Sequence, residues 1–290
     1  MKTAQRLLSD ALIQEKVIEA IGKIFCDREP HAQELLTKAL NSETDELARD
    51  ILDDIIDNAA LAREERLPLC QDTGLLVVFA RLGVDVRLEI CLRDTLEQAA
   101  AIAWQKYYMR DSIAPDPLRG QLDECEDIRS ESDARLPIVL HLEQVPGDGL
   151  SLDLALKGGG AENMSALRMF NPSAKVEEIV EFVVDTVVNA GGRPCPPVIV
   201  GVGIGGDFEL SAILAKRALF TDSDERGTCY RELEKDILRR INERGRGVMG
   251  LAGRNTALEV RILTAPCHIA SLPVAVNLDC HAHRHIRVEI

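Results

Sequence analysis

Apolar side chains recur every three or four residues along the start of the chain, with charged residues between them. One such run extends from Leu7 to Ile24, and a second extends from Leu47 to Ala59. This spacing places the apolar side chains on one face of a helix. We therefore expect residues 1–66 to form a helical layer, which packs on the rest of the chain or on a second subunit.

The remaining chain mixes short apolar runs, which indicate strands, with longer amphipathic stretches, which indicate helices. The expected strands cover residues 75–80, 84–90, 136–145, 150–156, 198–202, 257–264, 273–278 and 286–290. The expected helices cover residues 94–108, 176–188, 209–219 and 230–242. Short turns predict two hairpins, one between the first two strands and one between the next two.

This pattern predicts a mixed α/β fold of the α+β class, in which the helical N-terminal layer packs on mixed or antiparallel sheets. The sequence shows no internal repeat and no linker that would divide it. We therefore expect a single domain over residues 1–290, with the helical layer at 1–66 and a catalytic core at 67–290.

The composition narrows the class of protein. Only 3% of the 290 residues are aromatic, so the core must be aliphatic. The net charge of −14 argues against binding to nucleic acid or to an anionic membrane, and an anionic ligand would need a local basic pocket. The sequence contains neither an apolar run of membrane-spanning length nor a signal peptide. With eight scattered cysteines, this predicts a cytoplasmic protein with reduced thiols.

A polar stretch at residues 110–134 contains many acidic residues together with Pro115 and Pro117. Its length and composition predict a long loop, which would be either a lid over a site or a disordered connection.

The sequence Cys-Gln-Asp-Thr-Gly at residues 70–74 places a thiol, a carboxamide, a carboxylate and a hydroxyl directly before an expected buried strand. Gly74 permits a tight turn at this point. Two interpretations are open from the residues alone. The side chains form a reactive group, or Asp72 accepts backbone N–H groups in a turn while Cys70 is a small buried hydrophobe.

Lys157 precedes three successive glycines, and the run continues as Ala-Glu-Asn-Met-Ser to residue 165. Successive glycines expose backbone N–H groups that can bind an anion. The alternative is a flexible segment at the end of a hairpin.

The glycines from Gly201 to Gly206 match Gly-x-Gly-x-x-Gly between an expected strand and an expected helix, as a dinucleotide site requires. The acidic residue of such a site follows about 20 residues later, at the end of the next strand. Asp222 and Asp224 stand near that distance but between two helical segments. A turn that lets a helix pack closely on a strand explains the glycines better, and an NAD-binding oxidoreductase is the alternative.

His281, His283 and His285 alternate near the end of the chain. In a strand they would share one face and could bind zinc together with His268 or Cys280. A solvated or interfacial face is the simpler explanation, and a non-catalytic zinc-binding module is the alternative.

Cys70, Cys195 and Cys280 each stand beside polar residues at the boundary of an expected strand, too far apart in sequence for a compact ligand motif. Iron–sulfur clusters are held by thiolates, often in a Cys-Pro sequence, and three thiolates leave one iron of a four-iron cluster open. From the residues alone, such a cluster is one hypothesis among several.

Together these motifs resemble the iron–sulfur hydro-lyases of the class I fumarate hydratase and L-tartrate dehydratase family, specifically their α subunit. The resemblance extends from near residue 67 to the C-terminus. Its matching stretches are residues 70–74, residues 157–165, residues 195–197 with the following glycine turn, and residues 265–268 through Cys280 and Arg284.

The resemblance implies roles for individual residues. The ligands of a [4Fe-4S] cluster would be Cys70, Cys195 and Cys280. The substrate-binding residues would be Gln71, Arg110 and Gly159, and the catalytic residues would be Asp72 and His268. Arginine suits such a role because its guanidinium group offers two parallel N–H donors to a carboxylate.

The resemblance also implies a reaction and a partner. The reaction would be reversible hydration of fumarate to (S)-malate, with conversion of tartrate to oxaloacetate as the alternative. The glycine run at residues 157–165 resembles fumarate hydratases more closely than tartrate dehydratases. Single-chain relatives continue into a second domain that completes the site, so we expect a separate β subunit and an α2β2 assembly that binds a dicarboxylate.

Overall fold

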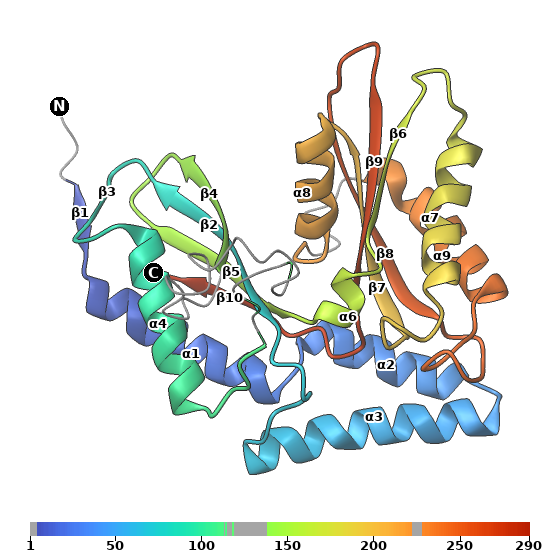
Figure 1. The fold of residues 1–290 in the computed structure, drawn as a ribbon, viewed down its shortest axis with the longest axis horizontal. Helices are drawn as coiled ribbons and strands as arrows, with labels where there is room; N and C mark the ends of the chain where they lie inside the picture. The colour runs from blue at the N-terminus through green and yellow to red at the C-terminus, as the bar shows by residue number, and fades with distance from the viewer. Residues whose placement is uncertain (1–4, 113, 115–117, 119–137, 222–227) are drawn as a thin grey trace. The chain divides into compact units, whose positions relative to one another are not determined.

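The computed structural model describes residues 5–112, 114, 118, 138–221 and 228–290 (Figure 1). Most of the polar stretch expected at residues 110–134 lies outside these residues. Contacts divide the chain into two compact units. The first consists of Met1–Asp27, Arg66–Lys157 and Arg284–Ile290, and the second consists of Arg28–Glu65 and Gly158–His283. The expected single domain over residues 1–290 stays a prediction.

The first unit contains a four-stranded sheet in the order β10-β5-β2-β4. Its strands are β2 (Leu75–Gly83), β4 (Ile138–Val145), β5 (Leu150–Lys157) and β10 (His285–Glu289). The expected hairpin of β4 with β5 is wrong, because β2 lies between them, parallel to β4 and antiparallel to β5. The nearly continuous apolar run of β2 is buried when it occupies this inner position.

Two helices cover this sheet, α1 (Asp10–Cys26) and α4 (Leu92–Lys106). They contact each other and contribute to one core with the strands. The fully buried side chains of this core are aliphatic, as the composition predicts, and include Ile13, Ile21, Leu96, Leu152 and Leu154.

A short parallel pair of strands, β1 (Arg6–Leu8) and β3 (Val86–Leu88), corrects two expectations. The first helix does not include residues 6–8, because Ser9 caps it by accepting the Leu12 N–H at 3.3 Å. The strand expected at residues 84–90 does not pair with β2, because β4 and β5 already occupy both edges of β2. It pairs with β1 instead.

The second unit contains a sheet in the order β6-β9-β7-β8 (Figure 1). Its strands are β6 (Ala166–Phe170), β7 (Val198–Gly205), β8 (Ala257–Ala265) and β9 (Leu272–Asp279). β7 is parallel to β8 and antiparallel to β9. The mixed sheets and helices of both units confirm the α+β class.

Helices cover both faces of this second sheet. They are α7 (Val176–Ala190), α8 (Phe208–Ala218) and α9 (Arg231–Arg244). The segment Gly158–His283 also contains two short helical elements, α6 (Gly159–Glu162) and η1 (Thr228–Tyr230). The apolar stripe of α7 is buried as expected, and the helix ends at Gly191, whose φ of 58° suits glycine.

The glycines of β7 explain the Gly-x-Gly-x-x-Gly pattern. A Cβ atom at Gly201 or Gly203 would lie within 3.0 Å of α8 backbone atoms, a separation that real Cβ atoms do not show. The two neighbouring valines, Val200 and Val202, point to the opposite face and join the core with α7 and α9. The glycines therefore permit close packing of α8 on β7, as predicted, and they lie within the strand rather than in a phosphate-binding loop.

The helices expected at residues 1–66 are confirmed from Asp10 to Glu65, since α2 (Pro30–Ser42) and α3 (Glu46–Glu65) follow α1. In the second unit, Leu36 and Leu52 of this helical pair form a small core with Val248. None of the helices in the described part of the chain combines the length and the apolar character needed to cross a membrane.

Glu43, at the end of α2, joins this helical pair to a distant loop. Its carboxylate accepts the N–H groups of Thr44 (2.9 Å) and Arg254 (3.0 Å) and the side-chain amide of Asn255 (2.7 Å). The residue is only 3% exposed. Burial raises the pKa of the Glu43 carboxyl, but the backbone N–H donors lower this pKa further, so that it falls below its ordinary value of 4.5.

We expect Glu43→Gln to lower the free energy of unfolding by about 2–3 kcal/mol, because the glutamine amide group would face N–H donors. A carboxyl whose pKa is depressed in the folded state stabilises the protein above its unfolded pKa and ceases to do so as the pH falls through its folded pKa. The difference from the wild type should therefore be full at pH 7 and shrink below pH 4.5. Urea unfolding at several pH values measures it.

Glu34→Gln is the matched control, since Glu34 is an exposed residue of α2. It should change the free energy of unfolding by no more than about 0.5 kcal/mol. Equal effects of the two substitutions at pH 7 would contradict the role given to Glu43.

Candidate active site

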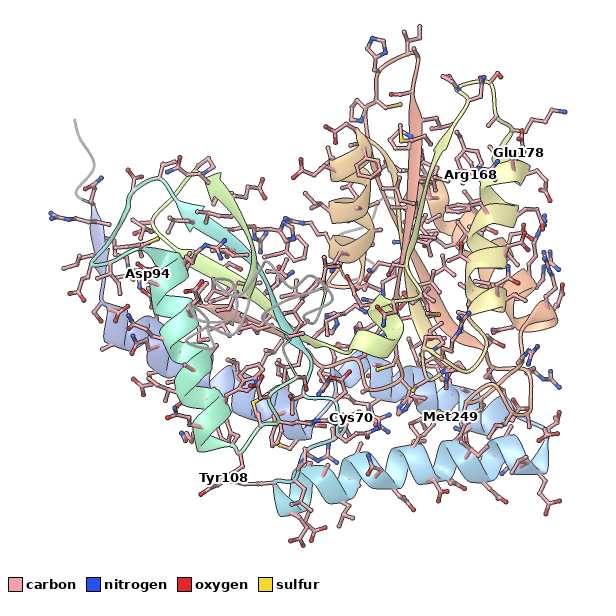
Figure 2. The ribbon with its side chains drawn as sticks, viewed as in Figure 1. Cys70, Asp94, Tyr108, Arg168, Glu178 and Met249 are labelled. Carbon is pink, nitrogen blue, oxygen red and sulfur yellow. The ribbon has the colours of Figure 1, made fainter. Side chains whose placement is uncertain are left out.

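The turn at residues 70–74 lies in the first unit, between α3 and β2, and Figure 2 labels Cys70. The Cys70 thiol is partly exposed and donates to the Gln71 side-chain carbonyl at 3.6 Å. Asp72 Oδ1 accepts the Gly74 N–H at 2.9 Å, so the carboxylate shapes the turn as the simpler interpretation predicts. Gly74 has a φ of +82°, which glycine adopts readily. This turn holds its polar side chains in a defined arrangement.

The structure brings Arg110 to this turn. α4 ends at Lys106, and the chain returns so that the Arg110 carbonyl accepts the Thr73 hydroxyl at 2.6 Å. Thr73 is buried, whereas Arg110 is exposed. Two stretches that are distant in sequence thus bring an arginine beside the turn that carries Gln71 and Asp72.

In the second unit, Cys195 and Cys280 lie at the same end of the sheet. Cys195 precedes β7 and Cys280 follows β9, and these antiparallel strands place Ile199 opposite Asp279. The His281 N–H donates to the Cys195 carbonyl at 3.4 Å. Both cysteines are partly exposed thiols. The tertiary structure therefore places two cysteines that are far apart in the sequence at the same end of one sheet.

The backbone at Cys195 is strained. Its φ of 53° is uncommon for a residue with a side chain. The Met249 N–H donates to the carbonyl of the neighbouring Pro196 at 2.7 Å, and Figure 2 labels Met249 near this end of the sheet. Strained residues held by their surroundings occur often at functional sites.

The glycine run adjoins the Cys195 turn. Gly158 caps the single turn of α6, and a Cβ atom at Gly160 would lie 3.2 Å from the Arg193 carbonyl oxygen. The substrate-binding candidate Gly159 is the first residue of α6. Glycine thus permits the run to approach the segment that carries Cys195.

The polar residues after the glycines form a network that the sequence analysis did not identify. Glu162 pairs with Lys216 of α8 and accepts the side-chain amide of Asn277 at 3.0 Å. The same amide donates to the Ser165 hydroxyl at 2.8 Å. Lys216 and Asn277 lie in ordinary amphipathic and apolar segments, so no local pattern marked them. The network attaches α6 to α8 and β9.

His268 lies away from the other candidates of the second unit. It is exposed in the connection between β8 and β9, at the end of the sheet opposite to Cys195 and Cys280 (Figure 1). The structure therefore does not bring His268 of one chain to these two cysteines of the same chain.

The terminal histidines do not form the face that the zinc alternative requires. β10 begins at His285, so His281 and His283 precede the strand. His283 is 1% exposed, and its Nδ1 lies 2.8 Å from an Asp279 carboxylate oxygen. The expectation of three histidines alternating along one strand is wrong, because the chain turns before β10.

A surface groove along α7 is a poor site for a dicarboxylate. Its lining includes Arg168 and Glu178, which Figure 2 labels, and three further acidic residues, Glu177, Glu181 and Asp185. The excess of carboxylates would repel an anionic substrate.

The residues around the cysteines fit an iron–sulfur cluster. Thiolates are the usual ligands of such clusters, and two of the predicted three lie at one end of one sheet. Among the described residues, the buried Nη1 of Arg284 has no hydrogen-bond partner, and this side chain is 2% exposed. A buried N–H donor without a partner is costly, so a hydrogen-bond acceptor would suit this nitrogen. That Cys70 supplies the third thiolate stays a prediction.

Comparison with known proteins identifies the family of the chain. The family model described as "Fumarate hydratase (Fumerase)" matches residues 14–289. A Methanocaldococcus jannaschii protein named "Putative L(+)-tartrate dehydratase subunit alpha" is 34% identical over 280 residues, covering 94% of this chain and 95% of its own length. "L(+)-tartrate dehydratase subunit alpha" of Escherichia coli (strain UTI89 / UPEC) is 28% identical over 254 residues, covering 86% and 81%.

The family model matches nearly the whole chain, and one relative is more than 30% identical over nearly its whole length. These two findings assign the chain to a family. The resemblance found in the motifs is confirmed, and the names of the family and of the relatives support a hydro-lyase. It belongs to the fumarate hydratase (Fumerase) family, among the α subunits of the class I iron–sulfur hydro-lyases.

Proposed function

We propose that this chain is the α subunit of a [4Fe-4S] hydro-lyase that adds water to, or removes it from, a four-carbon dicarboxylate. The observation that carries the proposal is the pair Cys195 and Cys280, which share one end of the second sheet beside the glycine run. Membership of the family supports the reaction class.

In this proposal Cys70, Cys195 and Cys280 hold the cluster. When bound, the cluster supplies Lewis-acid chemistry at the iron that has no thiolate ligand, which makes a hydroxyl group easier to expel. The buried guanidinium group of Arg284 favours an anion nearby, since its Nη1 has no partner among the described residues.

The other candidates bind substrate and move protons. Arg110 offers a carboxylate two N–H donors, Gln71 offers an amide, and the backbone at Gly159 approaches the anion. Negative charge develops on the substrate carboxylate as the adjacent carbon loses its proton, and these donors stabilise that charge. Asp72 is the group that accepts or supplies protons. The catalytic role of His268 stays a prediction, because His268 lies at the end of the second sheet opposite to Cys195 and Cys280.

Two substrates have support. The relatives reported above are named as tartrate dehydratase subunits, which favours L(+)-tartrate. The family description and the run Gly-Gly-Gly-Ala-Glu-Asn-Met-Ser at residues 158–165 favour fumarate and malate. Because these substrates differ by one hydroxyl group, anaerobic assays of both with the same enzyme preparation decide between them.

A separate β subunit belongs to the proposal. The relatives are named as subunits, which implies further chains in their enzymes. We propose an α2β2 assembly in which the β subunit adds cationic side chains to the substrate site. This chain is acidic, with a net charge of −14, and an anionic substrate needs positive charge around it.

We expect Asp72→Asn to reduce activity by about a hundredfold or more while the turn remains intact. Asparagine keeps a side-chain oxygen that accepts the Gly74 N–H, but it cannot exchange a proton. The measurement is kcat for hydration and dehydration in the anaerobic enzyme with its β subunit, with the iron content determined in parallel.

Asp148→Asn is the control, because Asp148 is an exposed acid in the turn between β4 and β5. It should leave kcat unchanged. If Asp72→Asn keeps full activity with full iron content, Asp72 does not transfer a proton.

A further inference from the structure

β6 forms one edge of the second sheet. In the order β6-β9-β7-β8 it pairs with β9 alone, and no other described strand lies on its second side. Alternate residues of an antiparallel strand direct their N–H and C=O groups away from the partner strand. Such an edge is a template for a further strand unless charged residues or proline block it. Four of the five residues of β6 are apolar, and Arg168 is its single charged residue, so this edge is open to strand addition.

A groove of about 500 Å³ lies beside β6, a volume in the range of ligand sites. Arg168 lines it from the strand, and the other lining residues belong to α7, from Glu177 to Asn189. We call it the α7 groove, and Figure 2 labels Arg168 and Glu178 within it. Its α7 wall is about 18 Å long at 1.5 Å per residue, and the five residues of β6 span about 17 Å. The α7 groove therefore has the length of the strand.

Aromatic rings connect the strand to the helix inside this groove. The Phe182 ring of α7 meets the Phe170 ring of β6 edge-on, with 5.6 Å between the ring centroids. The Arg168 guanidinium carbon lies 4.6 Å from the centroid of the Phe170 ring. Side chains alternate along a strand, so Arg168 and Phe170 face α7, whereas Met169, which is 48% exposed, faces the other way. A strand added to β6 would likewise direct alternate side chains into the α7 groove.

The charge of the α7 groove is negative. α7 contributes four carboxylates to its lining, and β6 contributes one arginine. From α9, Arg240 binds Glu177, and Arg244 binds Glu181 and Asp185. These three acidic side chains remain between 42% and 61% exposed, and the carboxylates outnumber the guanidinium groups even when both α9 arginines are included. The ion pairs fix the carboxylates in place, and the groove attracts cationic groups.

We propose that the α7 groove binds an extended basic segment of another protein, which adds to the second sheet as a strand beside β6. Backbone hydrogen bonds to β6 provide affinity, and lysine or arginine side chains at alternate positions of the segment meet the carboxylates. A small polycation would leave the strand edge unpaired. A second copy would bring another acidic surface, since this chain has a net charge of −14. The occupant that satisfies both the edge and the charge is a basic strand.

The first test is peptide binding to the full-length protein. The probe is a fluorescein-labelled peptide of seven residues in which lysine and valine alternate, and its fluorescence anisotropy is followed at low salt. One comparison peptide has glutamate in place of lysine, and the other keeps the lysines but is N-methylated at every peptide bond. We expect the probe to bind at least about tenfold more tightly than either comparison peptide, because one lacks the charge and the other lacks the backbone donors.

The second test locates the bound probe by hydrogen–deuterium exchange. We expect the amides of residues 166–170 to exchange at least about fivefold more slowly in the presence of the lysine–valine peptide, because a paired edge protects its N–H groups. β10 is the matched control, since it is an edge strand of the first sheet. Its exchange should not change.

The third test neutralises two carboxylates of the α7 groove. In Glu178→Gln with Asp185→Asn, the side-chain oxygens remain, so residue 178 still accepts the Lys175 N–H that Glu178 accepts at 2.9 Å. We expect binding of the probe to weaken by about tenfold with an unchanged melting temperature. The control is Glu209→Gln with Glu232→Gln, which removes two exposed carboxylates of α8 and α9 that do not line the groove. It should bind the probe like the wild type.

Several results would overturn the proposal. Equal binding of the N-methylated peptide would show attraction by charge without strand addition. Unprotected β6 amides in the bound protein would place the probe elsewhere. Protection of β6 that rises with protein concentration in the absence of peptide would identify a second copy as the occupant. None of these measurements uses hydro-lyase activity or the cluster, so their outcome is independent of the proposed function.

Discussion

Cys195→Ala will abolish cluster binding: the anaerobically purified protein should fall from about four irons per chain to near none and lose its brown colour. The site holds the cluster by three thiolates in the proposed function, and the open iron has none. Two thiolates leave a second iron without a protein ligand, which exposes the cluster to dissociation. Hydro-lyase activity with the β subunit should fall to the level of a preparation that lacks this chain. Iron and sulfide content, the visible spectrum and the activity assay measure these changes.

Cys229→Ala is the matched control for this experiment. Cys229 is an exposed thiol in η1 that has no place in the proposed site. This variant should retain iron, colour and activity. A Cys195→Ala protein that keeps its full iron content and spectrum would remove Cys195 from the ligand set, and with it the observation on which the proposed function depends.

Gly203→Ala is expected to destabilise the second unit by about 3 kcal/mol or more. The added Cβ atom would meet the Ser211 carbonyl oxygen and the Ala215 nitrogen within 3.0 Å, and both are backbone atoms of α8. Backbone cannot rotate away as a flexible side chain can, so the helix must shift from β7. Urea unfolding and the yield of folded protein measure the loss.

Gly149→Ala provides the comparison. The nearest atom to a Cβ at Gly149 is the Ile290 carbonyl oxygen at 3.8 Å, an ordinary contact distance. We expect a change of no more than about 1 kcal/mol. If Gly203→Ala were as stable as Gly149→Ala and instead showed a loss of NAD binding present in the wild type, the glycines would have a nucleotide-binding role and not a packing role.

Much of the local structure could be predicted because its signal lies within a few residues. The apolar stripe of α7 repeats at helical spacing and is terminated by Gly191, and the structure contains that helix with the same buried face. The turn at Cys70 was expected from Gly74 and the apolar run after it. Short-range periodicity determines which face of an element is apolar, and that is sufficient to predict the element itself.

Strand pairing was predicted poorly, because pairing depends on competition between segments that are distant in sequence. β4 and β5 are joined by a short turn that is typical of a hairpin, yet β2 lies between them. An inner position covers both edges of β2 and buries its apolar residues, which a hairpin of β4 with β5 alone would not do. The same competition directs β3 to β1.

The amino-acid sequence by itself determined the helices, most strands, the aliphatic core and the family, because these depend on local periodicity and on motifs of adjacent residues. Tertiary structure alone decided that Cys195 and Cys280 share one end of a sheet and that His268 lies at the other. Sequence separation does not give spatial distance: antiparallel pairing brings residues 195 and 280 together, whereas one extended strand separates residues 268 and 280.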